Sequence, residues 1–216
     1  MIKLCIFDLD GTLLYTLDSI ARPTNLVLEH FGLAPQPVEA YKYFIGDGLK
    51  NEMKRALIAA GDKEACHLEE AFALCEQWFA EDPMYKVEPY PGVAETLQVL
   101  KEKGIKLAVF SNKPHLSAVR VVETFFGEEM FDCIQGQTER LPIKPDPAGA
   151  YEILKKLGVK ADDCLYLGDS NTDMMTGKNA GFMTVGAAWG YRTEQELREN
   201  GADLIIGRPC ELSGLL

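Results

Sequence analysis

From about Gly92 onward, strand-like and helix-like segments alternate along the chain. The strand-like segments are short apolar runs with β-branched and aromatic residues, whereas the helix-like ones carry apolar residues at three- and four-residue spacing. Such alternation is typical of an α/β fold in which helices cover both faces of a mostly parallel sheet. Together with residues 4–7, strands are expected at 106–110, 132–135, 163–167, 183–185 and 203–206, and helices at 92–103, 115–126, 147–157 and 172–179.

The stretch between the first strand and this alternating region has a different pattern. No convincing strand lies between about Tyr15 and Lys86, and helical spacing recurs in three runs. A segment rich in proline and glycine, residues 87–92, bounds it downstream. We therefore expect an α/β core formed by residues 1–14 and 87–216, interrupted by a helical insert at 15–86.

Composition narrows the possible partners. The formal net charge is −11, which argues against binding to a nucleic-acid backbone. The six cysteines include no CxxC pair and favour buried thiols in a reducing compartment. No signal peptide and no apolar run of membrane-spanning length is seen. We expect a cytoplasmic protein with no nucleic-acid or membrane partner, as a monomer or a homodimer.

The first strand, residues 4–7, ends in two carboxylates one residue apart, Asp8 and Asp10, followed by Gly11. In an extended strand these two side chains point to the same side. They repel each other unless a cation, a proton or a basic group lies between them. Mg²⁺ suits such a site because it keeps most of its waters and needs only one or two carboxylates. The alternative is a strand ending in a polar turn at Gly11.

Polar residues also follow other predicted strands. Because ligands of open α/β sheets bind outside the carboxyl ends of the strands, these residues are expected to converge on one crevice. Each has a structural alternative, since Ser, Asn and Asp can cap helices, an Asp can complement a helix dipole, and a loop lysine can be solvated. The residues concerned are Ser111, Asn112, Lys144, Asp169 and Asp173.

Together these residue types are those that phosphoryl transfer requires. A carboxylate nucleophile can form an aspartyl-phosphate and divide one difficult displacement into two easier steps. A second carboxyl group can protonate the leaving oxygen and then take a proton from water. A hydroxyl, a lysine and a metal held by carboxylates from two strands can neutralise the phosphoryl oxygens.

Four segments in order resemble the motifs of the haloacid dehalogenase-like hydrolases, and the resemblance extends over nearly the whole chain. The helical insert, with its Gly46–Gly48 loop, is similar to the small cap domain of the phosphoglycolate phosphatase-like branch. The resemblance implies a Rossmann-like core and a helical cap domain. The motif segments are Asp8-Leu9-Asp10-Gly11-Thr12, Ser111-Asn112, Lys144-Pro145 and Gly168-Asp169-Ser170 followed by Asp173.

The resemblance also implies roles for single residues. Asp8 would be the nucleophile and Asp10 the general acid and base, whose backbone carbonyl also contacts the metal. Thr12 would position the second carboxylate. The phosphate-binding set would be Thr12, Ser111, Asn112 and Lys144, flanked by Lys113, and the Mg²⁺ set would be Asp8, Asp10, Asp169 and Asp173, the last as a ligand or as a support.

The resemblance predicts a Mg²⁺-dependent hydrolase of a small phosphorylated metabolite, with phosphoglycolate as the substrate it suggests. A phosphosugar mutase and a pyrophosphatase on the same core are the alternatives. Many members carry an acidic residue shortly after the DGT turn, where this chain has Tyr15-Thr16, and this departure bears on the substrate. Lys50, Asn51 and Arg55 are candidates for gripping the substrate, against the alternative of a solvated helix face.

Overall fold

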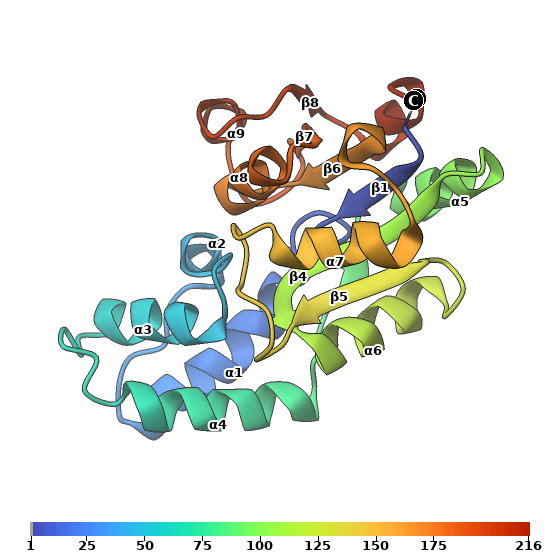
Figure 1. The fold of residues 1–216 in the computed structure, drawn as a ribbon. Helices are drawn as coiled ribbons and strands as arrows, with labels where there is room; N and C mark the ends of the chain where they lie inside the picture. The colour runs from blue at the N-terminus through green and yellow to red at the C-terminus, as the bar shows by residue number, and fades with distance from the viewer. Residues whose placement is uncertain (1) are drawn as a thin grey trace. The chain divides into compact units, whose positions relative to one another are not determined.

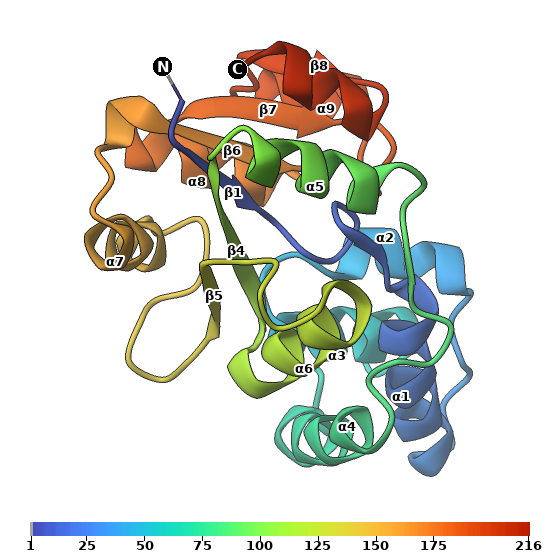
Figure 2. The same cartoon turned by 90° about the vertical axis from the view of Figure 1, so that its right-hand side faces the viewer.

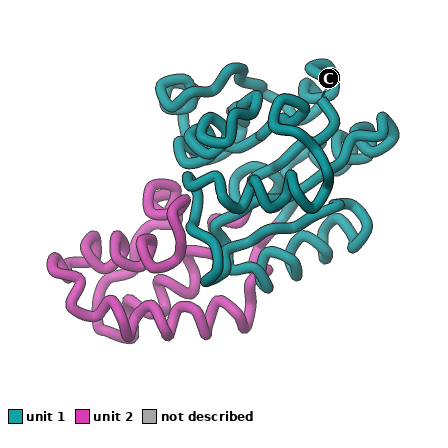
Figure 3. The backbone as a smooth tube through the Cα atoms, viewed as in Figure 1, with its two compact units in different colours: residues 1–15, 88–216 teal, residues 16–87 magenta. Residues whose placement is uncertain are grey.

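The structure, a computed structural model, describes residues 2–216 and divides into two compact units. Residues 1–15 and 88–216 form one of them, called here the sheet unit (Figure 3). Residues 16–87 form the other, called here the helical unit. In the described residues no helix has both the length and the apolar character needed to cross a membrane.

The sheet unit is built on a six-stranded parallel sheet with the order β5-β4-β1-β6-β7-β8 (Figure 1). The α/β fold predicted from the alternating pattern is therefore confirmed. The strands are β1 (Leu4–Phe7), β4 (Lys106–Pro114), β5 (Cys133–Gln137), β6 (Cys164–Gly168), β7 (Met183–Ala187) and β8 (Leu204–Ile206). The helices are α5 (Val93–Glu102), α6 (His115–Phe126), α7 (Ala148–Leu157), α8 (Asn171–Ala180) and α9 (Glu194–Glu199), with 3₁₀ turns at Ala161–Asp163 and Pro209–Gly214.

The central strands are apolar on both faces, because helices cover both (Figure 2). Successive side chains of a strand point to opposite faces, so Leu4 and Ile6 lie on one face of β1 and Cys5 and Phe7 on the other. The face of Leu4 and Ile6 packs with α7 through Ile153 in a buried cluster. Helix α5 lies on the opposite side of the sheet (Figure 2). This two-sided burial explains why β1 reads as a continuous apolar run.

The strand register brings the ends of three strands together. Phe7, the last residue of β1, pairs with Val109 on one side and Leu167 on the other. The residue after it, Asp8, therefore lies between β4 and β6, at the carboxyl edge where ligands of such sheets bind.

A two-stranded antiparallel ribbon forms where the chain leaves the sheet unit and where it returns. Strand β2 (Leu14–Tyr15) pairs with β3 (Glu88–Pro89). Neither strand was predicted, because two residues are too few to show a period. Helix α9 was not predicted either, although its sequence carries a helix-start signal. The Thr193 side chain caps the helix by accepting a hydrogen bond from the backbone N–H of Glu196.

The helical unit contains α1 (Leu17–His30), a 3₁₀ turn (Val38–Ala40), α2 (Tyr41–Phe44), α3 (Leu49–Ala59) and α4 (Leu68–Glu81). The three long helices are those that the spacing predicts. They pack on one apolar cluster that includes Val27, Met53 and Cys75. The carboxylate of Glu52 is buried in this unit and accepts a hydrogen bond of 2.7 Å from the Thr24 hydroxyl.

Candidate active site

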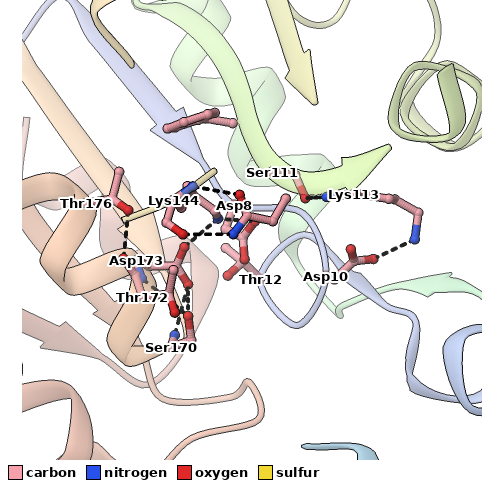
Figure 4. Close-up of polar contacts among 12 residues, drawn as sticks. Asp8, Asp10, Thr12, Ser111, Lys113, Lys144, Ser170, Thr172, Asp173 and Thr176 are labelled. Carbon is pink, nitrogen blue, oxygen red and sulfur yellow. Dashed lines mark hydrogen bonds and ion pairs between the residues drawn. The ribbon is translucent and has the colours of Figure 1, made fainter. Parts of the chain in front are cut away.

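A buried lysine connects two carboxylates at the carboxyl edge of the sheet (Figure 4). The ammonium of Lys144 donates to Asp8 Oδ1 and to Asp173 Oδ1, each at 2.7 Å, and contacts the Tyr166 hydroxyl at 3.3 Å. Only 2% of the Lys144 side chain is exposed, so the alternative of a solvated loop lysine is wrong. Burial alone lowers the pKa of Lys144, but Asp173 and Asp8 together raise it well above its usual value, so this cation is permanent.

The carboxylate of Asp173 has two protein contacts at each oxygen. Its Oδ1 receives Lys144 at 2.7 Å and the Tyr166 hydroxyl at 3.3 Å. Its Oδ2 accepts from the backbone N–H of Ser170 at 3.0 Å and from the Ser170 hydroxyl at 2.6 Å. Ser170 and Asp173 form a reciprocal capping box at the start of α8. Since a carboxylate offers about four acceptor sites and the Tyr166 hydrogen is shared with the Phe110 carbonyl, the protein itself takes up most of the acceptor capacity of Asp173.

Asp169 is held at both oxygens but keeps acceptor capacity. The Thr12 hydroxyl donates to its Oδ1 at 2.9 Å, and the backbone N–H of Tyr191 donates to its Oδ2 at 2.7 Å. The structural alternative in which Asp169 caps the following helix is wrong, because Ser170 is the cap of α8. Burial and the charge of Asp173 raise the pKa of Asp169 to about 7, against the opposing effect of the Tyr191 and Thr12 donors.

Asp8 is buried and bonded at one oxygen only. Among the described residues, Lys144 is the side chain that donates to Asp8, and it reaches Oδ1. Burial, followed by repulsion from Asp173, raises the pKa of Asp8 well above its ordinary value even though Lys144 opposes this. The second oxygen of Asp8 is therefore available to a ligand or to an electrophile.

These groups fit a divalent cation. Asp8, Asp169 and Asp173 offer carboxylate oxygens that all lie within 4.8 Å of one another. Lys144 supplies the one buried ammonium among them, which leaves two negative charges uncompensated. Burial first, and then this excess of negative charge, raise the pKa values of Asp8 and Asp169. Because the protein contacts Asp173 twice at each oxygen, Asp8 and Asp169 are the side chains with more acceptor capacity left for a hard cation.

Asp10 lies apart from this cluster of buried carboxylates (Figure 4). Its carboxylate is partly exposed and accepts an ion-paired hydrogen bond of 3.1 Å from Lys113, whose side chain is 2% exposed. The two strand-end carboxylates, Asp8 and Asp10, thus bind different lysines. Only Asp8 adds its carboxylate to the acidic cluster.

The Ser111-Asn112 pair continues strand β4 and does not cap a helix. Helix α6 begins at His115 and is preceded by Pro114, which makes no side-chain cap. The Ser111 hydroxyl accepts from the backbone N–H of Lys113 at 3.2 Å, which leaves its own hydrogen to be donated. The Asn112 amide binds the backbone of Lys144, donating to its C=O at 3.1 Å and accepting from its N–H at 2.8 Å.

Two contacts of the site were not anticipated. Tyr166 is fully buried in β6, and its hydroxyl contacts Lys144, Asp173 and the carbonyl of Phe110. A buried tyrosine in a central apolar strand usually needs a partner for its hydroxyl, and this was the available signal. The Tyr191 backbone N–H carried no signal, because a main-chain donor is the same at every residue but proline. Thr12 was expected to position the second carboxylate, but its hydroxyl donates to Asp169.

The candidates in the helical unit all have partners within that unit. Lys50 pairs with Glu69 at 2.7 Å. Asn51 donates to the carbonyl of Asp47 at 2.9 Å. Arg55 binds the Asp47 carboxylate and the Phe44 carbonyl, so it holds the glycine-containing loop in place.

Comparison with known proteins gives consistent matches. The family model of the haloacid dehalogenase-like hydrolases matches residues 5–187. The phosphoglycolate phosphatase of Haemophilus influenzae is 33% identical over 99% of this chain and 98% of its own length. That of Aquifex aeolicus is 31% identical, covering 99% of this chain and 96% of its own length.

A solved structure from Lactobacillus delbrueckii subsp. bulgaricus, described there as a candidate phosphoglycolate phosphatase, superposes with a TM-score of 0.91. It is 30% identical and covers 99% of this chain and 97% of its own. The family resemblance predicted from the four motif segments is thereby confirmed.

Proposed function

We propose that this chain, which belongs to the haloacid dehalogenase-like hydrolase family, is a Mg²⁺-dependent phosphomonoester hydrolase that works through an aspartyl-phosphate. The observation that carries the proposal is the Asp8 carboxylate, which is buried, fixed by Lys144 at one oxygen and open at the other. A carboxylate so placed can attack phosphorus without first leaving a strong solvation shell.

Asp8 and Asp10 have different roles in the proposed reaction, nucleophilic attack and proton transfer. Asp8 forms a bond to phosphorus as the bond from phosphorus to the ester oxygen breaks, and Asp10 gives that oxygen a proton. Asp10 then takes a proton from the water that attacks the aspartyl-phosphate, which releases phosphate and restores Asp8. The separation of the two carboxylates into different ion pairs supports this division, because only Asp8 belongs to the buried cluster.

Lys144 and Ser111 are the proposed phosphate-binding side chains. Lys144 brings a buried positive charge directly to Asp8, and the Ser111 hydroxyl can donate to a phosphoryl oxygen. Asn112 acts on Lys144 by fixing its backbone, and Thr12 acts on Asp169. Both residues therefore support the phosphate site through another residue.

Asp8 and Asp169 would hold the Mg²⁺, with the backbone carbonyl of Asp10 as a further ligand by family resemblance. When bound, the ion neutralises charge that develops on the phosphoryl group. Asp173 is proposed as a support for Lys144, because it binds the Lys144 ammonium and its carboxylate is contacted twice at each oxygen by the protein. The helical unit is proposed as the cap, and a cytoplasmic location and a monomer or homodimer remain predictions.

The proposed substrate is a small phosphorylated acid, phosphoglycolate. Relatives that carry this activity in their name match nearly the full chain, at 33% and 31% identity for the two described above. A phosphate-release screen with phosphoglycolate, hexose phosphates and pyrophosphate, run with and without Mg²⁺, tests the proposal. Release that is fastest from phosphoglycolate and requires Mg²⁺ supports it.

Two variants sharpen this screen. Asp8→Asn should abolish release, whereas the matched change Asp162→Asn, at an exposed carboxylate far along the sequence, should leave it unchanged. Isomerisation of a hexose phosphate without net release would favour a mutase, and preference for pyrophosphate would favour the third alternative. Full activity of Asp8→Asn would exclude Asp8 as the nucleophile.

A further inference from the structure

The segment after β7, residues 189–191, lies against the carboxylate of Asp169 and the turn that carries Thr12. The backbone N–H of Tyr191 donates to Asp169 Oδ2 at 2.7 Å. The indole N–H of Trp189 donates to the backbone carbonyl of Thr12 at 3.0 Å. Thr12 in turn donates its hydroxyl to Asp169 Oδ1 at 2.9 Å. One loop thus contacts Asp169 directly and also through Thr12.

Glycine between these two contacts allows the loop to approach this closely. A Cβ atom at Gly190 would lie 2.2 Å from Asp169 Cβ and 2.5 Å from its Oδ2. A Cβ at Gly11 would lie 2.4 Å from the same Oδ2, and Gly11 also has a φ of +92°. The backbone therefore approaches the Asp169 carboxylate closely at two glycines, where a side chain would collide with it.

Aromatic packing holds the other end of the loop. The ring of Tyr191 packs edge-on against Tyr15 with centroids 6.3 Å apart, and Tyr15 packs against Tyr90 at 6.4 Å. Tyr15 belongs to the Tyr15-Thr16 pair, where many family members carry an acidic residue. Its ring gives Tyr191 a rigid neighbour where a short acidic side chain would offer no such surface.

We propose that residues 189–191 are a positioning loop that fixes the Asp169 carboxylate for metal binding and so sets the Mg²⁺ affinity of this chain. The proposal rests on the metal site of the proposed function. A carboxylate restrained at both oxygens loses little freedom when it binds a cation, and groups of this kind behind a metal ligand commonly change metal affinity about 10- to 100-fold when removed. Trp189 and Gly190 would be positioning residues, since they act through Thr12 and Asp169.

Metal binding can be measured without turnover. Mn²⁺ is a spectroscopically visible substitute for Mg²⁺ at the proposed metal site. The loss of the EPR signal of free Mn²⁺ on addition of the full chain measures the Mn²⁺ affinity of that site. Gly190→Ala should weaken Mn²⁺ binding about 10- to 100-fold. The matched change Gly207→Ala should not, because its new methyl group would meet only Glu211 Oε1, at 3.8 Å.

Trp189→Phe is the milder variant and keeps the test valid if Gly190→Ala does not fold. It removes one hydrogen bond to the Thr12 carbonyl but keeps an aromatic ring, so we expect a severalfold weaker Mn²⁺ affinity. The control Trp78→Phe, in the helical unit, should leave the affinity unchanged. The concentration of Mg²⁺ for half-maximal phosphate release should rise in parallel in Trp189→Phe, with kcat recovered at saturating Mg²⁺.

The outcomes separate this inference from the proposed function. If Trp189→Phe and Gly190→Ala lower kcat or thermal stability but bind Mn²⁺ as tightly as the parent chain, the loop has only a structural role and the inference is wrong. A parent chain that binds no Mn²⁺ overturns it as well. If the loop variants bind Mn²⁺ more weakly but the parent chain hydrolyses no phosphomonoester, the inference stands and the proposed activity fails.

Discussion

Asn112 offers a quantitative test of how the phosphate-binding lysine is held. Its side-chain amide makes two hydrogen bonds to the backbone of Lys144, at 3.1 and 2.8 Å, and only 8% of the residue is exposed. In Asn112→Ala both backbone groups of Lys144 lose a partner at a buried position. An unsatisfied buried polar group costs about 1–3 kcal/mol, so two of them give about 2–6 kcal/mol. Water that enters the vacated space can bind the two backbone groups and so lowers this cost. We therefore expect Asn112→Ala to lower the free energy of unfolding by about 3 kcal/mol.

The matched control is Asn179→Ala, which acts on the next residue of the same loop. The Asn179 amide donates to the carbonyl of Pro145 at 3.0 Å, but in an exposed setting. Water can replace that donor, so the expected loss is at most about 1 kcal/mol. The two variants remove the same side chain but differ in burial and in the hydrogen bonds lost, which are two for Asn112 and one for Asn179.

Urea denaturation, followed by the fluorescence of Trp189 in a Trp78→Phe background, reports the sheet unit that contains Asn112 and Asn179. We expect Asn112→Ala to lower the transition midpoint clearly more than Asn179→Ala, with an unchanged m-value. We also expect Asn112→Ala to reduce phosphate release more than Asn179→Ala, because it frees the backbone of Lys144. Equal midpoints for the two variants would refute the reasoning that burial makes the Asn112 bonds essential.

Changes in pH and Mg²⁺ and the Asp173→Asn variant should each change the stability of the protein in a defined direction. Without Mg²⁺, stability should fall as pH rises from about 4 to about 7, because the pKa of Asp169 is raised from 3.8 to about 7 in the fold and its neutral form is the stabilised one. The rise in Tm caused by Mg²⁺ should accordingly be larger at pH 8 than at pH 5, and an equal rise at both would contradict the assignment of Asp169 to the metal. Asp173→Asn should destabilise the sheet unit by about 1–3 kcal/mol, since it takes an acceptor from the buried Lys144 and Ser170 donors while Lys144 stays paired with Asp8, and urea denaturation beside Asp162→Asn as control measures it. A loss below about 1 kcal/mol would show that Lys144 does not depend on Asp173.

The fold could be predicted because its strongest constraint is local. Each central strand is covered on both faces, so it appears in the sequence as an apolar run, and each crossover helix shows its own period. The ribbon of β2 and β3 lacks this signal, since its two-residue strands are specified by pairing across 73 positions, from Tyr15 to Glu88. Helix α9 is short, and Leu197 is its one buried side chain.

The candidate site could be predicted less completely. The convergence of Asp8, Lys144 and Asp169 follows from strand ends meeting at one edge, a property of topology. Which oxygen contacts which donor does not follow from topology. Asp173 could be a ligand or a support on sequence grounds, and its two protein contacts at each oxygen became visible only with side chains in place.

The contacts of Tyr191 show a second limit. Its donor is a main-chain N–H, and its position depends on how closely the glycine before it can approach Asp169. Neither the residue type nor its spacing from the motif segments encodes that distance. Backbone contacts between segments far apart in sequence are therefore the part of such a site that a single sequence leaves open.

The most direct test of the central claim is to trap phosphate on Asp8. In Asp10→Asn the residue that should activate water is lost, whereas p-nitrophenyl phosphate has a leaving group that departs without a proton. Once the parent chain is shown to release nitrophenol from this ester, Asp10→Asn should release one nitrophenol per chain in a burst and then slow. Borohydride reduction followed by mass spectrometry should find homoserine at position 8, and no burst should occur in Asp8→Asn. Steady hydrolysis with position 8 unmodified, or modification of another residue, would contradict the account.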